Sequence, residues 1–182
     1  MLTRIGITAH LLLVSFLSLP AMGGEEISPS GSSNSATCNH KLNILLSNDD
    51  GFDKPGIVAL QQALSQAKHR VVLAAPAKNA SGSSASITFA PVGVERVAKN
   101  TYAISASPAT SVVLAVSSLY PSGSRPDLII SGINKGANIG PATSISGTVG
   151  ATTAAINIID PPIASIAIST DPLGPNFSAE EN

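Results

Sequence analysis

The sequence contains few of the residues on which several common protein classes depend. Its 182 residues include one cysteine, 3% aromatic residues and only 12% charged residues, with a net charge of −1. Because Cys38 has no second cysteine to pair with, we expect a fold that is stable without an internal disulfide. Proteins that bind nucleic acid usually carry a basic stripe and aromatic platforms, so this composition argues against a nucleic-acid partner.

Long apolar runs are also missing, but a shorter one lies near the start of the chain. The segment "LLLVSFLSL" (11–19) follows Arg4, and the small residues Ala21 and Gly23 suit a signal peptidase. We interpret residues 1–23 as a signal peptide and expect an exported protein, periplasmic or secreted, without a stable membrane anchor after cleavage. The alternative is a retained anchor, although the apolar core is shorter than the ~20 residues of a spanning helix.

The rest of the sequence predicts one domain between two polar segments. Residues 24–41 are polar and rich in Ser, which predicts a flexible leader. Residues 171–182 contain prolines, a glycine and acidic residues near the end, which predicts a disordered tail. We therefore expect the folded domain to occupy residues 42–170.

The apolar pattern of this domain alternates between two kinds of element. Short apolar runs predict buried strands at 42–47, 70–76 and 126–132, and a further strand is predicted at 161–170. Helical spacing predicts helices between them, at 53–67, 108–120 and 146–159. Weaker β signals lie at 87–92 and 101–106, with a turn at 98–100. The alternation predicts an α/β fold, a Rossmann-like three-layer domain with a mainly parallel sheet.

The ends and faces of two predicted helices follow from local chemistry. In the first helix, Asp53 is the expected cap and Pro55 suits the first turn. Its apolar residues share one face at helical spacing. They are Ile57, Leu60, Leu64 and Ala67. The second helix is opened by Pro108 and capped by Ser107 or Thr110.

Polar loops follow three predicted strands, where parallel-sheet proteins bind ligands. They are "NDDG" after the first, "NASGSS" after the second and "GINKGANIG" after the third. Along a continuing strand Asp49 and Asp50 would point to opposite faces, so they can serve one ion only if the strand has ended, which Gly51 makes easy. The alternative is that "NDDG" is only a turn, because Asn, Asp and Gly dominate turns.

The adjacent aspartates predict a site for a hard divalent cation. With an amide oxygen from Asn134 and a hydroxyl oxygen from Ser81, they form an oxygen shell of the kind that Mg²⁺ or Mn²⁺ prefers. Zinc fits less well, because the sequence has three histidines and one of them lies within the predicted signal peptide.

A phosphate site is predicted at the helix that begins near "SGTV". The first turn of a helix offers unpaired N–H groups and a positive dipole end, and Ser146, Gly147 and Thr148 lie there. The alternative is that Ser146 only caps the helix. Lys135 is either a solvated charge or a further phosphate contact.

Taken together, the loops resemble the SurE family of stationary-phase survival proteins, which are metal-dependent nucleoside monophosphate phosphatases. The resemblance covers roughly residues 42–170. It rests on "ILLSNDDG" followed by "PGI", on "VVLAAPAKNASGSSASIT", on "PDLIISGINKGANIG" and on "SGTVGATTAAI". By similarity, Asp49 and Asp50 match the metal-binding acidic pair, and Ser81 and Asn134 match the serine and asparagine ligands.

The resemblance implies a phosphomonoesterase of the 5′-nucleotidase or acid phosphatase type, which uses Mg²⁺ or Mn²⁺ on nucleoside 5′- and 3′-monophosphates. Asp50, in preference to Asp49, is expected to orient or deprotonate the attacking water. The phosphate is expected to be held in line by a set of polar groups. They are Ser81, Gly82, Asn134 and residues 146–148.

The sequence also departs from the family pattern. Pro141 and Ala142 lie where family members often carry acidic residues. Family proteins continue past the segment that matches 161–170 into further sheet and a carboxyl-terminal arm that reaches neighbouring subunits. We therefore expect a chain shortened at its carboxyl terminus, in which the arm behind the family's homo-oligomers is missing. A catalytically impaired metal- or nucleotide-binding remnant, or a fragment of a longer protein, is the alternative function.

Overall fold

A computed structural model describes residues 40–170. The strands are β1 (Asn43–Ser47), β2 (Arg70–Pro76), β3 (Val94–Ala98), β4 (Thr101–Ile104), β5 (Leu128–Asn134) and β6 (Ser165–Ser169). The helices are α1 (Pro55–Gln66), α2 (Pro108–Ser118), α3 (Gly147–Asn157) and the 3-10 helix η1 (Gly140–Ser144). The expected signal peptide, most of the leader and the expected tail lie outside the described residues.

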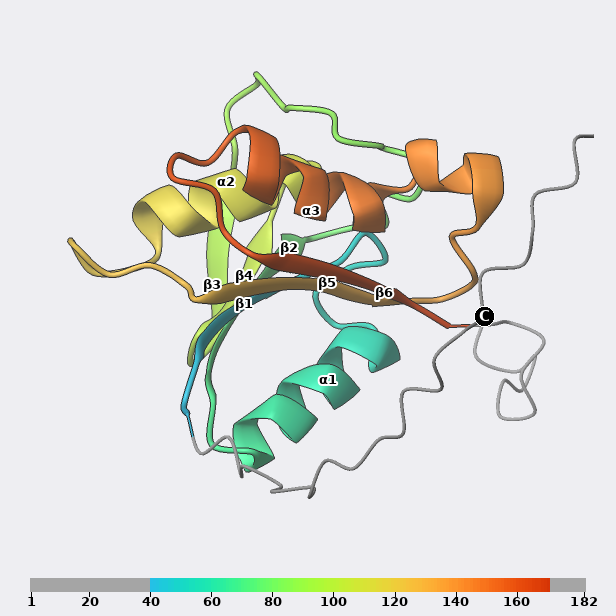
Figure 1. Ribbon diagram of the computed structural model, residues 1–182. Helices are drawn as coiled ribbons and strands as arrows, with labels where there is room; N and C mark the ends of the chain where they lie inside the picture. Colours follow the sequence, from blue (N-terminus) through green and yellow to red (C-terminus); the bar gives the residue numbers. More distant parts are fainter. Residues whose placement is uncertain (1–39, 171–182) are drawn as a thin grey trace, which may run out of the picture. The chain divides into compact units, whose positions relative to one another are not determined.

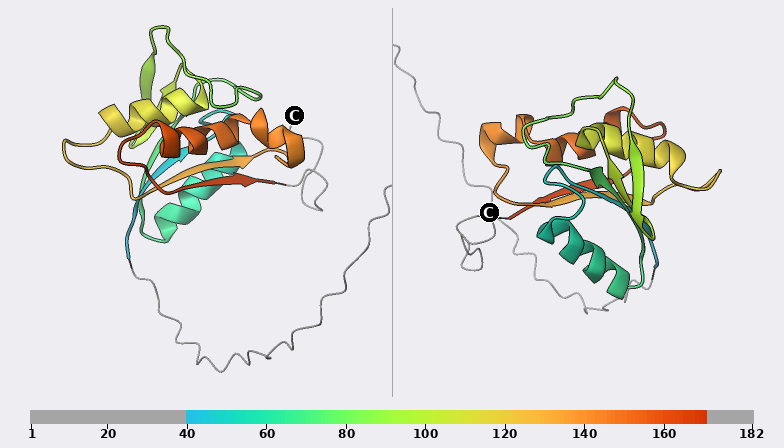
Figure 2. Two further views of the ribbon diagram at one scale, coloured as in Figure 1. Left: turned by 45° about the horizontal axis from the view of Figure 1, so that its top comes forward. Right: turned by 180° about the vertical axis from the view of Figure 1, so that it is seen from behind.

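The strands form a six-stranded sheet in the order β3-β4-β2-β1-β5-β6. Neighbouring strands run parallel except β3, which is antiparallel to β4. Figure 1 shows α1 on one face of this sheet and α2 and α3 on the other, and the turned views of Figure 2 show the same layers. The prediction of a three-layer α/β domain with a mainly parallel sheet is confirmed.

The central strands are buried on both faces, as their apolar runs predicted. On β1, Leu45 belongs to the hydrophobic cluster beneath α2 and α3, which includes Val112 and Ala151. Its neighbours Ile44 and Leu46 belong to the cluster that packs against Ile57 of α1. Successive side chains of a strand point to opposite faces, so one short strand supplies both cores. The carboxyl end of β1 is therefore anchored in both hydrophobic clusters.

The first weak β signal was placed wrongly. No strand forms at 87–92, because this segment is tied to the beginning of α2 instead of to a neighbouring strand. The backbone N–H of Thr88 donates to Thr110 Oγ1 at 2.8 Å, and Thr88 Oγ1 accepts from the N–H of Ser107 at 3.1 Å. Pro91 has no N–H to donate to a ladder. The strand of this region, β3, begins later and turns into β4 at residues 99–100, within the predicted turn.

The helix ends show one confirmed cap and one wrong cap. Ser107 caps α2, since its side chain accepts from the N–H of Thr110 at 3.3 Å. Asp53 does not cap α1: Lys54 holds that position without a side-chain hydrogen bond, and the exposed Asp53 lies 3.9 Å from its ammonium group. Ala67, expected on the buried face, is the exposed C-cap residue.

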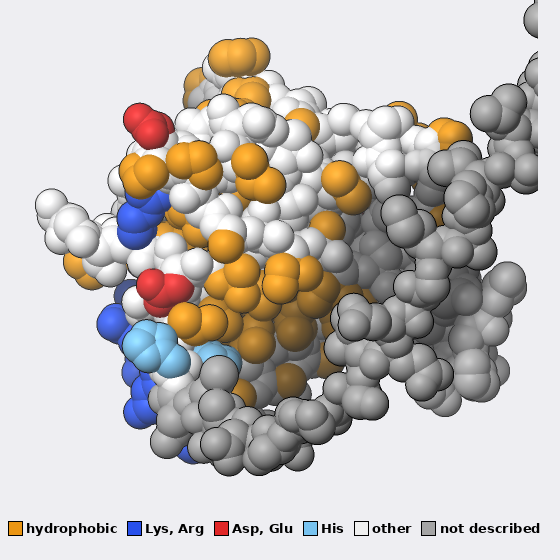
Figure 3. All heavy atoms as spheres, viewed as in Figure 1, with side chains coloured by type: hydrophobic (Ala, Val, Ile, Leu, Met, Phe, Trp, Pro, Cys, Tyr) orange, Lys and Arg blue, Asp and Glu red, His pale blue; other side chains and the backbone are white. Residues whose placement is uncertain are grey.

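Edge strand β6 has no outer neighbour among residues 40–170. Figure 3 shows hydrophobic side chains gathered over and below this strand, where Ile166 is 47% exposed.

In the described part of the chain, none of the helices has the length and apolar character needed to cross a membrane.

Two hydroxyl groups are buried next to each other in the sheet. Ser47 of β1 and Ser131 of β5 are register partners, and neither hydroxyl has a hydrogen-bond partner among the described residues. Removing an unpaired buried hydroxyl relieves a desolvation penalty, so Ser131→Ala is expected to leave the free energy of unfolding unchanged or raise it by about 1 kcal/mol. Ile129→Ala, two residues away, is expected to lower it by about 2–5 kcal/mol.

Urea denaturation of both variants and the unaltered chain measures these differences. A loss of about 2 kcal/mol or more in Ser131→Ala would show that the hydroxyl binds a buried water or another group in solution.

Candidate functional site

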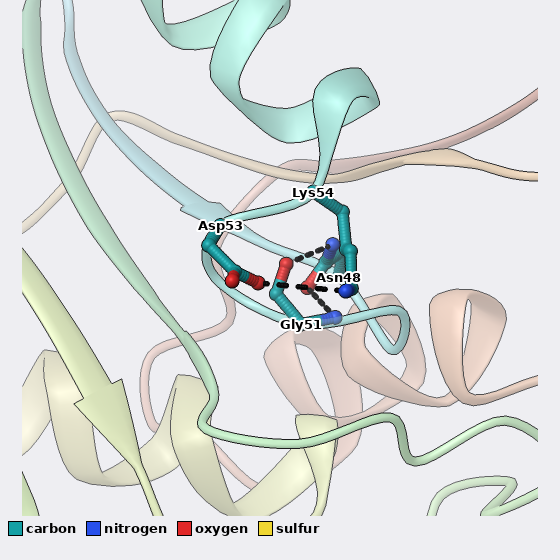
Figure 4. A network of polar contacts seen from close by, with 4 residues as sticks. All are labelled: Asn48, Gly51, Asp53 and Lys54. Atoms are coloured by element: carbon teal, nitrogen blue, oxygen red, sulfur yellow. Dashed lines mark hydrogen bonds and ion pairs between the residues drawn. The ribbon is translucent and has the colours of Figure 1, made fainter. Parts of the chain in front are cut away.

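The acidic pair lies in the loop that leaves β1 on the carboxyl edge of the sheet. The strand ends at Ser47, so the aspartates lie beyond it, as the sequence required for both to serve one site. Asn48 braces the turn: its Nδ2 donates to the carbonyl oxygen of Gly51 at 2.8 Å, and its Oδ1 accepts from the N–H of Gly51 at 3.2 Å (Figure 4). Gly51 has φ +129°, a backbone conformation that residues with a side chain rarely adopt.

Asp49 is 3% exposed and is held by two segments distant in sequence. The hydroxyl of Thr148, in the first turn of α3, donates to Asp49 Oδ1 at 2.6 Å. The backbone N–H of Ala80 donates to the carbonyl oxygen of Asp49 at 2.7 Å. Asp49 is therefore fixed between the beginning of α3 and the loop that follows β2.

Asp50 is half-buried and faces the loop that follows β5. Its Oδ2 accepts from the backbone N–H of Lys135 at 3.0 Å. Burial raises the pKa of Asp50 above its ordinary value, and the neighbouring Asp49 adds to the rise, while the Lys135 N–H opposes it. A carboxylate in such surroundings gains from a cation placed beside it.

Asn134, the last residue of β5, is 9% exposed. Its Nδ2 donates to the carbonyl oxygen of Gly136 at 2.8 Å, so the amide oxygen is the atom suited to a cation. Lys135 follows directly, and its backbone contact with Asp50 brings Asn134 and the acidic pair together. The structure therefore joins three of the four expected metal ligands through the loops after β1 and β5.

The loop after β2 carries Ser81 and Gly82, which are both exposed. The N–H of Ser81 donates to Asn79 Oδ1 at 3.0 Å. Ala80 places this loop beside Asp49, but no hydrogen bond among the described residues joins the Ser81 hydroxyl to either aspartate. Gly82 has φ +74° and open space around its Cα.

Ser83 is the site residue that sequence reasoning missed. Its Oγ is buried and has no partner among the described residues. A Cβ added to Gly147 would lie 2.7 Å from Ser83 Oγ, 2.7 Å from Asp49 Cβ and 2.9 Å from Asp49 Oδ2, so all three groups converge on the beginning of α3. A run of serines gives no sequence signal that separates Ser83 from its neighbours.

The beginning of α3 uses the hydroxyl groups expected to hold phosphate for other contacts. Ser146 Oγ accepts from the N–H of Val149 at 3.2 Å, so Ser146 caps the helix, and its contact with phosphate stays a prediction. The hydroxyl of Thr148 is fully buried and donates to Asp49. The first-turn N–H groups at Gly147 and Thr148 are therefore the part of this helix end that suits an anion.

Two hollows flank the loop that contains Ser83. One, of about 300 Å³, lies between Ser84, η1 and α3, and its lining includes Ser144, Ser146 and Gly150. The other, of about 460 Å³, is lined by residues 77–80, Ser83 and residues 104–107. Both open at the carboxyl edge of the sheet, where β2 and β4 end and α3 begins.

The donor set at this edge excludes a shell made of charged or thiolate ligands alone. Among residues 40–170 there is no group of three or more His, Cys, Asp or Glu side chains that could hold a metal ion. Two carboxylates completed by amide and hydroxyl oxygens remain, and this is the chemistry that hard divalent cations prefer.

Comparison with known proteins gives consistent matches. A family model described as "Survival protein SurE" matches residues 44–181. The 5′-nucleotidase SurE 1 of Burkholderia lata is 39% identical over 129 residues, which cover 70% of this chain and 49% of the relative. The 5′-nucleotidase SurE of Nitratiruptor is 45% identical over 129 residues, covering 69% and 48%.

A solved structure supports the same relationship. The crystal structure of a SurE protein from Aquifex aeolicus matches with a TM-score of 0.62 and 36% identity, covering 71% of this chain and 51% of that chain. The chain thus spans about half the length of the relatives it matches.

Proposed function

The chain belongs to the SurE family, and on this basis we propose that it is a metal-dependent phosphomonoesterase that releases phosphate from nucleoside 5′-monophosphates, with activity on 3′-monophosphates and other phosphate esters. The two relatives described above are named 5′-nucleotidases. The observation that carries the proposal is the pair Asp49 and Asp50 just beyond β1, held by contacts from the loop after β2, the loop after β5 and the beginning of α3.

The residues at this edge fit a divalent cation such as Mg²⁺ or Mn²⁺. Asp49 and Asp50 supply negative charge, and Asn134 supplies an amide oxygen at the end of β5. Ser81 is the fourth expected ligand, in an exposed loop. Such a cation supplies positive charge that polarises a phosphoryl group and makes water more acidic.

The residues of the chain position the substrate and accept a proton from the attacking water. The first turn of α3, with N–H groups at Gly147 and Thr148, attracts the phosphate through the helix dipole. Thr148 fixes the orientation of Asp49 through the 2.6 Å hydrogen bond. Asp50, whose pKa is raised by burial, is suited to accept a proton from the attacking water, because a base with a raised pKa holds that proton better.

The experiment that tests this proposal measures phosphate release from 5′-AMP, 3′-AMP and glycerol 2-phosphate by the full chain with added Mn²⁺ or Mg²⁺. We expect release from all three, fastest from 5′-AMP, and no release in EDTA. Binding of 5′-AMP without any turnover would replace the proposal with the alternative of a binding remnant.

Metal binding can be measured without turnover. Mn²⁺ at 100 times its dissociation constant is expected to stabilise the folded chain by about 2.7 kcal/mol, because a ligand that binds only the folded state raises its stability. Differential scanning calorimetry reads this as a rise in Tm. Asp49→Asn is expected to remove most of the rise, and an equal rise in this variant would place the ion elsewhere.

A further inference from the structure

From the geometry of the loops after β2 and β4, we infer that the 460 Å³ hollow lined by residues 77–80, Ser83 and residues 104–107 binds the nucleoside part of the substrate. This inference rests on the proposed function, since it assigns the leaving group of the same reaction to a place on the protein. The phosphate then lies over the acidic pair, and the sugar and base extend over the ends of β2 and β4.

The hollow is built where two parallel strands end side by side. β2 and β4 are paired as far as Pro76 and Ile104, and the next N–H, that of Ala77, donates to the carbonyl oxygen of Ile104 at 2.8 Å. Beyond this contact, the segments that follow β2 and β4 form the walls of the hollow. Ligands of parallel sheets bind at such carboxyl ends.

One wall of the hollow lies next to the acidic pair. Ala80 lines the hollow, and the N–H of Ala80 donates to the carbonyl oxygen of Asp49. Ser83 also lines it, and its Oγ converges with Asp49 on the beginning of α3. Asp50 and Lys135 lie on the β5 side of Asp49, so an ester that reaches from Asp50 across Asp49 arrives in this hollow.

The lining matches a neutral ligand with apolar faces and hydroxyl groups. The alanines at 77, 80 and 106 provide apolar surface in the hollow, above the fully buried Ile104. Asn79 adds an amide group suited to a sugar hydroxyl, while the Ser105 hydroxyl is bonded to Gly93 and the Ser107 hydroxyl caps α2. Lys78 is the only charged residue of the lining, and it is exposed. The volume of the hollow is within the usual range for small-molecule sites.

The lining also predicts weak selection among bases. None of the lining residues in the described part of the chain is aromatic. Stacking on aromatic rings is a major source of affinity for bases, and here it is missing. We expect kcat/KM values for the four common nucleoside 5′-monophosphates to lie within about tenfold of one another.

The test fills the hollow with a large side chain. Ala77→Trp is suitable because Ala77 is exposed and lines the hollow, and its backbone contact with Ile104 does not require a small side chain. We expect the ratio of kcat/KM for 5′-AMP to kcat/KM for glycerol 2-phosphate, whose leaving group is too small to fill the hollow, to fall about tenfold or more. The matched control is Ala63→Trp, an exposed change on α1 across the sheet, which is expected to keep the ratio (Figure 1).

A second measurement does not depend on turnover. The full chain is titrated with adenosine, without metal or phosphate, and followed by ¹H–¹⁵N NMR. We expect amide shifts at residues 77–80, 83 and 104–107, and their loss in Ala77→Trp. If phosphate is released but the ratio is unchanged and adenosine shifts none of these amides, the inference is wrong and the proposed function stands. If no ester is hydrolysed but adenosine shifts these amides, the proposed function is wrong and the nucleoside site stands.

Discussion

Asp50→Asn is expected to lower metal-dependent phosphate release by about 10³-fold or more, because it removes both a charge for the cation and the proposed proton acceptor. The same variant is expected to be at least as stable as the unaltered chain when metal is absent. Burial raises the pKa of Asp50, so the folded state binds its proton more tightly than the unfolded chain does. Stability is then lost as pH rises from the ordinary value of 3.8 through the raised pKa, and a neutral Asn avoids that loss.

The matched control is Asp53→Asn, three residues along the same loop. Asp53 is exposed, and its only ion pair among the described residues, with Lys54, spans 3.9 Å at the surface (Figure 4). Exposed pairs of this kind contribute little, so we expect unchanged activity and stability. Steady-state assays and thermal unfolding with and without Mn²⁺ compare the three proteins. Asp50→Asn with near-normal turnover would remove Asp50 from the reaction.

Gly150→Ala is expected to damage both stability and activity, although alanine is a better helix former than glycine by about 1 kcal/mol. A Cβ at this position would lie 1.9 Å from the carbonyl oxygen of Ser84, a backbone atom. The loop cannot move away easily, because Ser84 is held by hydrogen bonds to the carbonyl oxygens of Ser144 and Ile145, at 2.8 and 3.0 Å. We expect a net loss of about 1–3 kcal/mol in the free energy of unfolding.

The same change displaces α3, whose first turn holds Asp49 through Thr148. A shift of about 1 Å at such a site is expected to lower kcat about 10²-fold. Ile156→Ala, at a 53% exposed position of the same helix, is the control and is expected to change both quantities little. Urea denaturation and steady-state kinetics measure the effects. A fully stable, fully active Gly150→Ala would show that the loop and α3 are not packed as described.

The sequence predicts the sheet well where strands are buried on both faces. The apolar runs of β1, β2 and β5 are continuous because both of their faces meet helices, and few other structures produce such short apolar runs. The segment at 87–92 is different, since apolar residues there include Pro91 and the backbone of Thr88 bonds to α2. Contacts between segments distant in sequence decide such cases, and local propensity does not contain them.

The candidate site was predictable to a similar extent. The sequence predicts that Asp49, Asp50 and Asn134 lie at strand ends and therefore near one another, because the ends of parallel strands meet at one edge. The role of Thr148 as a support for Asp49 and the position of Ser83 depend on how α3 packs against the loop after β2. That packing needs glycines at 147 and 150, because a Cβ at either position would collide with the atoms that face it. Those atoms are known only from the structure.

The most direct test of the proposed metal-dependent site is phosphate release from 5′-AMP by the full chain, measured with Mn²⁺ and again with excess EDTA. We predict release with Mn²⁺ and none with EDTA, because the acidic pair acts through a divalent cation. Equal release under both conditions, or no release from a sample that unfolds cooperatively on heating, would contradict the proposal.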